Sequence, residues 1–156
     1  MSVRLVRAIQ RYLVNPPVKA LFRLGIVPPG YALLETVGRR SGRRRRTPVG
    51  DGLVGETFWI VAEYGRQAAY VKNIAANPRV RIQVREGLRM IWRTGTAVVV
   101  ADDDPHARQR ALGAGGLNRR LNAIAVRIVG TDLTTVRVDL DPRADRSAAR
   151  GRYAAR

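Results

Sequence analysis

The sequence predicts a mainly β domain of the α+β class, in which about six mostly antiparallel strands close into a barrel with helices at its flanks. Short runs rich in β-branched and aromatic residues recur along the chain, separated by glycine, proline and aspartate. The connections between these runs are mostly short, as antiparallel neighbours allow. Helical periodicity is confined to segments near the start, the middle and the later part of the chain.

Residues 1–141 are predicted to form this single domain, which begins with helices within residues 3–24. Residues 3–14 carry an apolar stripe at helical spacing, opposite a face rich in arginine. The Asn-Pro-Pro sequence at residues 15–17 ends this helix, and a second short helix fits residues 18–24. A basic amphipathic helix either packs on its own domain or lies on an anionic membrane surface, and packing is the favoured interpretation.

Three strands are predicted in the segment that follows. Tyr31–Val37 is the first, and Arg45–Leu53 is the second. The sequence from Asp51-Gly52 to Gly55 supplies the turn after it. Thr57–Ala62 is almost continuously apolar, which predicts a third strand in a central position of the sheet.

The rest of the domain alternates helices and strands. Ala68–Ala76 is predicted as a helix that Asn77-Pro78 ends. Val80, Ile82 and Val84 alternate with polar residues, which predicts a strand with one buried face. A further strand, Met90–Ala101, is predicted to bulge near Gly95.

A last helix pair and strand complete the prediction. Asp104-Pro105 is a typical helix start, with a carboxylate cap before proline, and the helix runs through Leu112. Residues 117–129 are predicted to be helical and Thr134–Leu140 to be the last strand. Residues 142–156 contain almost no apolar core residues and are predicted to be a basic disordered tail.

The composition is strongly basic. The 156 residues carry a net charge of +17, and of the 29 basic residues only Lys19 and Lys72 are lysine. Such a charge favours polyanionic partners: nucleic acid, an anionic membrane, or a phosphorylated or polycarboxylate ligand. The chain has no cysteine, which excludes disulfides, thiolate metal sites and cysteine nucleophiles. It lacks an apolar run of about 20 residues and a signal-peptide pattern, so we expect a cytoplasmic protein, with membrane association as the alternative.

Residues 38–49, here called the arginine segment, place six arginines within eight positions between two predicted strands. Glycines at 38 and 42 allow a tight turn within it. Guanidinium groups held between two strands suit an anion with several negative charges. If the segment is extended, Arg43, Arg45 and Thr47 share one face and Arg44 and Arg46 the other. Only one of these sets can face a ligand directly.

No metal site is predicted. Asp102-Asp103-Asp104 is interpreted as a carboxylate cluster that favours the start of the following helix. The one histidine, His106, has no histidine or cysteine to share a metal with. No serine lies in the Gly-x-Ser-x-Gly pattern of hydrolases.

Four runs of sequence, in this order and spacing, resemble the deazaflavin-dependent nitroreductase family, which belongs to the split β-barrel superfamily of flavin and deazaflavin oxidoreductases. The runs are Leu34-Glu35-Thr36-Val37-Gly38-Arg39-Arg40-Ser41-Gly42, Arg45-Arg46-Thr47-Pro48-Val49, Trp59-Ile60-Val61-Ala62 and Asn73-Ile74-Ala75-Ala76-Asn77-Pro78-Arg79-Val80. The resemblance implies a split β-barrel of the FMN-binding type, a homodimer, and a small-molecule substrate. It also implies coenzyme F420 as cofactor, with FMN less favoured, and transfer of hydride to quinones, nitro compounds or activated alkenes.

The resemblance also implies cofactor contacts. The guanidinium groups of Arg39, Arg40 and Arg45 would bind the phosphate and oligoglutamate tail of F420, while Ser41 and Gly42 would contribute backbone N–H groups. The deazaflavin ring would lie near residues of two strands: Thr47, Pro48, Val49, Val61 and Ala62. Where the helix of the family closes over the cofactor, this chain has Tyr70, Lys72 and Asn73.

The proton donor is not assigned, and Tyr64 and Tyr70 are candidates by location alone. The chain departs from the best-studied relatives after the third strand, where it has Tyr64-Gly65-Arg66. It also lacks the late tyrosines that line their nitro-substrate pocket, because the only tyrosine after Tyr70 is Tyr153. These departures favour an acceptor other than a nitro compound.

The alternative hypothesis is a non-catalytic basic split barrel that binds nucleic acid, lipid or a membrane surface. The net charge supports salt-sensitive binding to nucleic acid without sequence specificity. No helix-turn-helix or stacking-aromatic pattern accompanies that charge. The N-terminal helix is the segment that would make a peripheral membrane contact.

Overall fold

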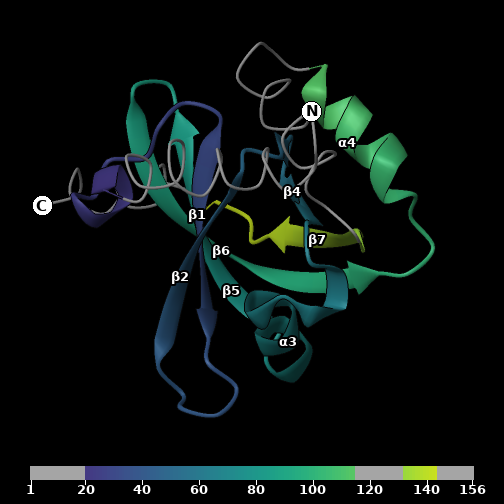
Figure 1. The fold of residues 1–156 in the computed structure, drawn as a ribbon. Coiled ribbons are helices and arrows are strands. Elements are labelled where there is room, and N and C mark those ends of the chain that lie inside the picture. Colours follow the sequence, from purple (N-terminus) through teal and green to yellow (C-terminus); the bar gives the residue numbers. More distant parts are fainter. Residues whose placement is uncertain (1–19, 115–131, 144–156) are drawn as a thin grey trace, which may run out of the picture.

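The computed structural model describes residues 20–114 and 132–143, which form one curled, antiparallel, seven-stranded sheet with short helices at its flanks (Figure 1). The strand order is β2-β1-β5-β6-β7-β4-β3. In chain order the elements are β1 (Tyr31–Val37), β2 (Arg44–Gly50), β3 (Leu53–Val54), β4 (Thr57–Ala62), the 3-10 helix η2 (Gly65–Gln67), α3 (Ala69–Ala76), β5 (Arg79–Glu86), β6 (Arg89–Val100), α4 (Pro105–Gly113) and β7 (Thr134–Leu140).

The predicted mainly β, split-barrel type of fold is confirmed, with one additional short strand. The additional strand is β3, whose two residues pair with the start of β4 across a turn at Gly55 (φ +60°). A positive φ at this position suits glycine, which has no Cβ to clash. The sequence had placed Leu53 at the end of the preceding strand; instead, β2 ends at Gly50 and the chain turns before β3.

The prediction that Thr57–Ala62 is central in the sheet was wrong. This segment is β4, which pairs with β7 on one side and only with the two-residue β3 on the other. Phe58, Ile60 and Ala62 point into the core, while Trp59 and Val61 are half-buried on the other face. The apolar run therefore serves two environments, the core and a cavity described below.

The core lies on the inner face of the curled sheet. Its least exposed side chains come from strands far apart in sequence, including Leu34, Phe58, Ile82 and Val136, each with 0% exposure. Apolar burial of this kind is the main source of folding free energy. Residues 71 and 74 of α3 add to the same cluster.

Strand β6 passes through Gly95 without the predicted bulge. Its register with β5 and with β7 is unbroken on both sides of this residue. A Cβ atom at Gly95 would lie 2.6 Å from the carbonyl oxygen of Asp139. The glycine therefore permits a close approach of β7 to β6.

The predicted start of α4 is confirmed. The side chain of Asp104 accepts a hydrogen bond from the backbone N–H of His106 at 2.9 Å, and Pro105 occupies the first turn. Of the predicted N-terminal helices, residues 20–23 are helical, Leu24 lies in a turn, and residues 3–19 lie outside the described residues. The predicted helix at 117–129 and residues 144–156 of the predicted tail also lie outside them.

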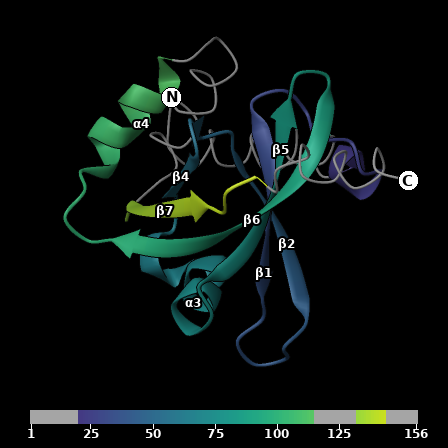
Figure 2. The ribbon, with the colours of Figure 1, turned by 180° about the vertical axis from the view of Figure 1, so that it is seen from behind.

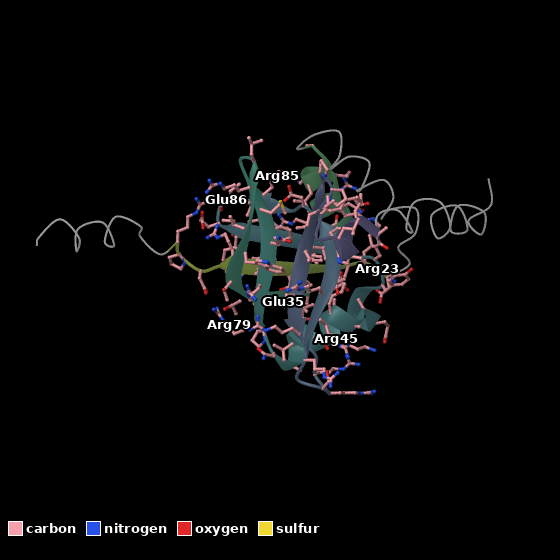
Figure 3. All side chains as sticks on the ribbon, turned by 90° about the vertical axis from the view of Figure 1, so that its left-hand side faces the viewer. Arg23, Glu35, Arg45, Arg79, Arg85 and Glu86 are labelled. Atoms are coloured by element: carbon pink, nitrogen blue, oxygen red, sulfur yellow. The ribbon has the colours of Figure 1, made fainter. Side chains whose placement is uncertain are left out.

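The outer face of β1 and β2 holds a cluster of charges around one carboxylate. Glu35, whose side chain is 3% exposed, pairs with Arg44 at 3.1 Å, Arg46 at 3.0 Å and Arg81 at 3.0 Å. The guanidinium groups of Arg46 and Arg81 also lie 5.2 and 4.9 Å from the ring centroid of Trp92. Figure 3 shows Glu35 near the middle of this face.

These arginines keep Glu35 charged. Burial alone would raise the pKa of Glu35, but the hydrogen bond from Arg46 and the neighbouring guanidinium charges outweigh it and hold the pKa below its ordinary value of 4.5. The stabilisation that Glu35 contributes is therefore present above pH 4.5 and is lost as the pH falls through its folded-state pKa.

We predict that Glu35→Gln lowers the free energy of unfolding by about 2 kcal/mol at pH 7, because hydrogen bonds to a charged acceptor are lost from a buried position. Urea unfolding at a series of pH values measures this. The difference from the wild type should shrink as the pH falls below 4.5, where the wild-type carboxylate also loses its charge.

The control is Asp139→Asn, which removes an exposed carboxylate that pairs with Arg137 at 3.1 Å on the surface. Its effect should stay below about 1 kcal/mol. Equal losses for the two variants would contradict a special role of Glu35.

Candidate functional site

A cavity of about 390 Å³ opens between the end of β2, the outer side of β4, the start of α3 and α4. Its wall is mostly apolar and aromatic and includes two carboxylates, from Asp51 and Glu63. Although the chain is strongly basic, the described residues contribute no arginine or lysine to this wall. The lining residues are Tyr31, Thr47, Pro48, Val49, Gly50, Asp51, Trp59, Ile60, Val61, Glu63, Tyr64, Ala68, Ala69, Tyr70, Gln109 and Leu112.

Local structure places these side chains. Alternation along β4 directs Trp59 and Val61 away from the core residues Phe58 and Ala62. After β4, the 3-10 helix η2 reverses the chain, and the backbone N–H of Ala68 donates to the carbonyl of Gly65 at 3.2 Å. The start of α3 thereby returns to the same cavity.

Burial shifts the pKa of three titratable groups in the wall. Burial raises the pKa of Glu63 above its ordinary value of 4.5. Burial, and to a smaller extent the charge of Glu63, raises the pKa of Tyr70 and that of Tyr31 above 10. Tyr64 is 60% exposed while it lines the cavity, so it lies where the cavity meets solvent. Both sequence-based proton-donor candidates, Tyr64 and Tyr70, therefore lie in the cavity wall.

Gln109 is the buried polar residue of α4. Its side chain is 3% exposed, and its Oε1 atom has no hydrogen-bond donor among the described residues. The helix that carries it is held by its neighbour Arg108, which bonds to Asp103 at 2.8 and 3.2 Å and lies 3.7 Å from the ring centroid of Trp59. Gln109 is thus kept at the cavity by contacts other than its own.

Sequence reasoning missed both Glu63 and Gln109. A signal existed for Glu63, because it directly follows a strand whose alternate residues face the cavity. For Gln109 the only signal was its spacing of three residues from Leu112, which puts both on one face of the helix. Neither signal indicates a cavity until the position of α4 is known.

The arginine segment is divided between two faces, as strand alternation predicted. Arg44 and Arg46 bind Glu35 on the outer face. Arg45 pairs across the sheet with Thr36, and Thr47 pairs with Leu34, so these residues share the opposite face. Thr47 lines the cavity, whereas Arg45, two residues earlier on the same strand, does not.

A short network joins the turn of this segment to α3. The Oδ1 atom of Asn73 accepts from the backbone N–H and from Nη1 of Arg39, both at 3.2 Å, and its Nδ2 donates to Thr36 at 3.1 Å. The N–H of Gly42 donates to the carbonyl of Gly38 at 2.8 Å, so in this conformation it serves the turn and is not free to bind an anion. The turn and α3 lie at one end of the molecule and α4 at the other (Figures 1 and 2).

The structure thus brings together part of the predicted cofactor site. Thr47, Pro48, Val49, Val61 and Tyr70 line the cavity. The remaining predicted residues lie outside its wall: Arg39, Arg40, Ser41, Gly42 and Arg45 in the turn and strand beside it, Ala62 in the core with 0% exposure, and Lys72 and Asn73 on α3.

Two further properties concern the described residues. Among them, no group of three or more histidine, cysteine, aspartate or glutamate side chains is arranged to hold a metal ion. None of the helices in this part of the chain is long and apolar enough to cross a membrane.

Solved structures share the fold. The heme storage protein HutZ from Vibrio cholerae has a TM-score of 0.52 at 16% identity, over 82% of this chain and 90% of that one. An F420H2-dependent reductase, FDR-A, has a TM-score of 0.50 at 19% identity, over 70% and 94%. A chain described as a domain-swapped dimer has a TM-score of 0.51 at 18% identity, over 80% and 96%. Identities this low establish the fold alone.

Family membership rests on the sequence. Among curated proteins, none matches the chain. The family model described as F420H2-dependent quinone reductase matches residues 3–141, which is most of the chain. This match confirms the deazaflavin-dependent family indicated by the four sequence runs and the use of F420 that it implies. The chain belongs to the F420H2-dependent quinone reductase family of oxidoreductases.

Proposed function

We propose that the cavity holds the deazaflavin ring of F420 beside a quinone-type acceptor, and that the arginine segment holds the phosphate and oligoglutamate tail. The observation that carries this proposal is the separation of two environments: a mostly apolar cavity to which the described residues contribute no basic side chain, and a row of guanidinium groups beside it. A nitro compound or an activated alkene is the alternative acceptor.

The cavity fits a flat heteroaromatic ring. Its volume of about 390 Å³ is within the range of ligand pockets in general. Pro48 and Val49 supply apolar surface from β2, and Val61 supplies it from β4. Apolar walls favour an aromatic ring system and exclude water from its reacting face.

The arginine segment fits a string of negative charges. Arg44 and Arg46 are engaged with Glu35. Arg40, Arg43 and Arg45 are exposed and form no hydrogen bond or ion pair through their side chains within the described part of the chain. Guanidinium groups in this state bind phosphate and carboxylate oxygens in a bidentate way. The network of Asn73 would orient Arg39 toward the same ligand.

When bound, the reduced cofactor supplies a hydride, and the protein has to supply a proton. Conversion of a quinone to a hydroquinone requires one hydride and one proton. Two carboxyl groups lie in the wall, those of Asp51 and Glu63, and the other acidic groups there are the phenols of Tyr31, Tyr64 and Tyr70. The raised pKa of Glu63 keeps its carboxyl protonated to a higher pH than that of an exposed glutamate. We therefore assign proton delivery to the acceptor oxygen to Glu63.

For partners, we propose a homodimer, since a structural neighbour is described as a domain-swapped dimer. Light scattering on the purified chain measures the molar mass. The membrane contact predicted for residues 3–14 lies outside the described residues and stays a prediction. Non-specific binding to nucleic acid rests on net charge alone and also stays a prediction.

We predict that Arg45→Ala weakens F420 binding about 10-fold, because one charge-assisted contact is lost. Arg44→Ala is the matched control, since its guanidinium group is held by Glu35 at 3.1 Å on the opposite face of the same strand. Fluorescence titration with oxidised F420 measures both affinities.

A deazaflavin riboside, which lacks the phosphate and the glutamates, shows whether Arg45 contacts the tail of the cofactor or its ring. Arg45→Ala should bind this analogue as the wild type does. If Arg45→Ala and Arg44→Ala weaken F420 binding equally, or if the analogue shows the same loss as F420, the arginine segment is not the tail site.

We predict that wild-type kcat/KM for quinone reduction falls as the pH rises through the raised pKa of Glu63, because the proton is then absent. Glu63→Gln should lose this pH dependence and reduce kcat about 100-fold. Tyr64→Phe is the comparison, since Tyr64 lines the same cavity at its solvent side. A pH profile that survives in Glu63→Gln would exclude Glu63 as the donor.

The stability of Glu63→Gln provides a second test, which does not depend on enzymatic activity. A raised folded-state pKa means that wild-type stability is lost as the pH rises above the ordinary value of 4.5. The variant, which cannot ionise, should therefore be the more stable protein at neutral pH, and the difference should vanish below pH 4.5. Thermal unfolding at several pH values shows this. No difference at any pH would mean that the carboxyl is not desolvated.

A further inference from the structure

We propose that Gln109 is a substrate-binding residue whose carboxamide hydrogen-bonds the oxygen of the electron acceptor. This inference rests on the proposed function, because it assigns the acceptor a place in the same cavity. Its basis is the geometry of α4: a side chain that is 3% exposed, lies in the cavity wall and has an unpaired Oε1 atom among the described residues.

The fold of α4 does not require a carboxamide at this position. The helix is capped by Asp104 and fixed through Arg108, which contacts Asp103 and the ring of Trp59. A buried acceptor without a donor costs free energy, whereas an apolar side chain of similar size would not. Among the described residues, Oε1 of Gln109 therefore lacks a donor, which a ligand with a hydrogen-bond donor would supply.

The position of α4 indicates which ligand this is. The turn of the arginine segment and α3 lie at one end of the molecule, and α4 lies at the other in both views (Figures 1 and 2). The phosphate and tail of the cofactor are assigned to the first end. Gln109 shares the second end with Leu112 of the same helix, and the neighbouring wall residues Trp59 and Val61 are largely apolar. The acceptor is therefore the ligand within its reach.

The chemistry of a carboxamide suits an oxygen that gains a proton during the reaction. A quinone carbonyl only accepts hydrogen bonds, and the Nε2 group of glutamine can donate to it. The hydroxyl formed on reduction can donate, and Oε1 can accept. Rotation about the terminal torsion exchanges the two groups at low cost. One side chain can thus bind both the substrate and its product, which an aliphatic residue cannot.

Gln109→Leu tests the assignment, with Gln83→Leu as the matched control, since Gln83 is a half-buried glutamine on β5 outside the cavity wall. Four quantities are measured for the full chain: the Tm, the Kd of F420, the Kd of menadione from quenching of tryptophan fluorescence, and the KM of menadione. For Gln109→Leu we expect a Tm no lower than that of the wild type and an unchanged F420 affinity. The Kd and KM of menadione should rise about 10-fold, from the loss of one hydrogen bond.

Other outcomes overturn the assignment. A marked fall in Tm with unchanged menadione affinity would make Gln109 a structural residue. An unchanged menadione Kd, or a rise equal to that of Gln83→Leu, would also refute it, as would a wild type that does not bind menadione. If the wild type binds menadione but does not reduce it, and Gln109→Leu weakens that binding, the proposed function fails while the role of Gln109 stands.

Discussion

The structure depends on one carboxylate that neutralises a cluster of arginines. Glu35 lies on β1 with the core behind it and Arg44, Arg46 and Arg81 in front. Without this acid, the outer face of three neighbouring strands would bring like charges together, which opposes strand pairing. Glu35 also holds Arg44 and Arg46 in ion pairs on the outer face of the sheet. Arg40, Arg43 and Arg45 of the same segment form no side-chain hydrogen bond or ion pair within the described part of the chain, and they lie in the turn and on the opposite face of β2.

The exposed arginines, which attract an anionic ligand, thus lie apart from the cavity that contains Glu63. The protein carries a large positive charge, yet the side chains that the described part of the chain contributes to the cavity wall are acidic or neutral. A field from exposed arginines raises the local concentration of an anionic ligand and speeds its encounter. A guanidinium group inside the cavity would instead oppose the effect of burial and lower the pKa of Glu63. In the proposed function, the lack of a guanidinium group in the described wall favours the protonated form of Glu63.

Much of the local structure was predictable, because short sequence patterns determine it. The bounds of β1, β4 and β7 agree with the predicted Tyr31–Val37, Thr57–Ala62 and Thr134–Leu140, since alternation and turn residues define them locally. The place of β4 near the sheet edge was not predictable, because strand order depends on pairings between distant segments. The site positions of Glu63 and Gln109 could not be predicted for the same reason, because the two residues share a cavity only once α4 packs over β4.

The pairing of β4 with β7 has a consequence for synthesis on the ribosome. Within the described residues, β4 has only the two-residue β3 as a neighbour until β7, the last strand, has emerged. Until then, one edge of an apolar strand stays without hydrogen-bond partners, and such edges invite association between chains. Pairings between distant segments also form slowly. The nascent protein therefore cannot pair the second edge of β4 until β7 has emerged, and we expect its yield to respond to chaperones that shield exposed strands.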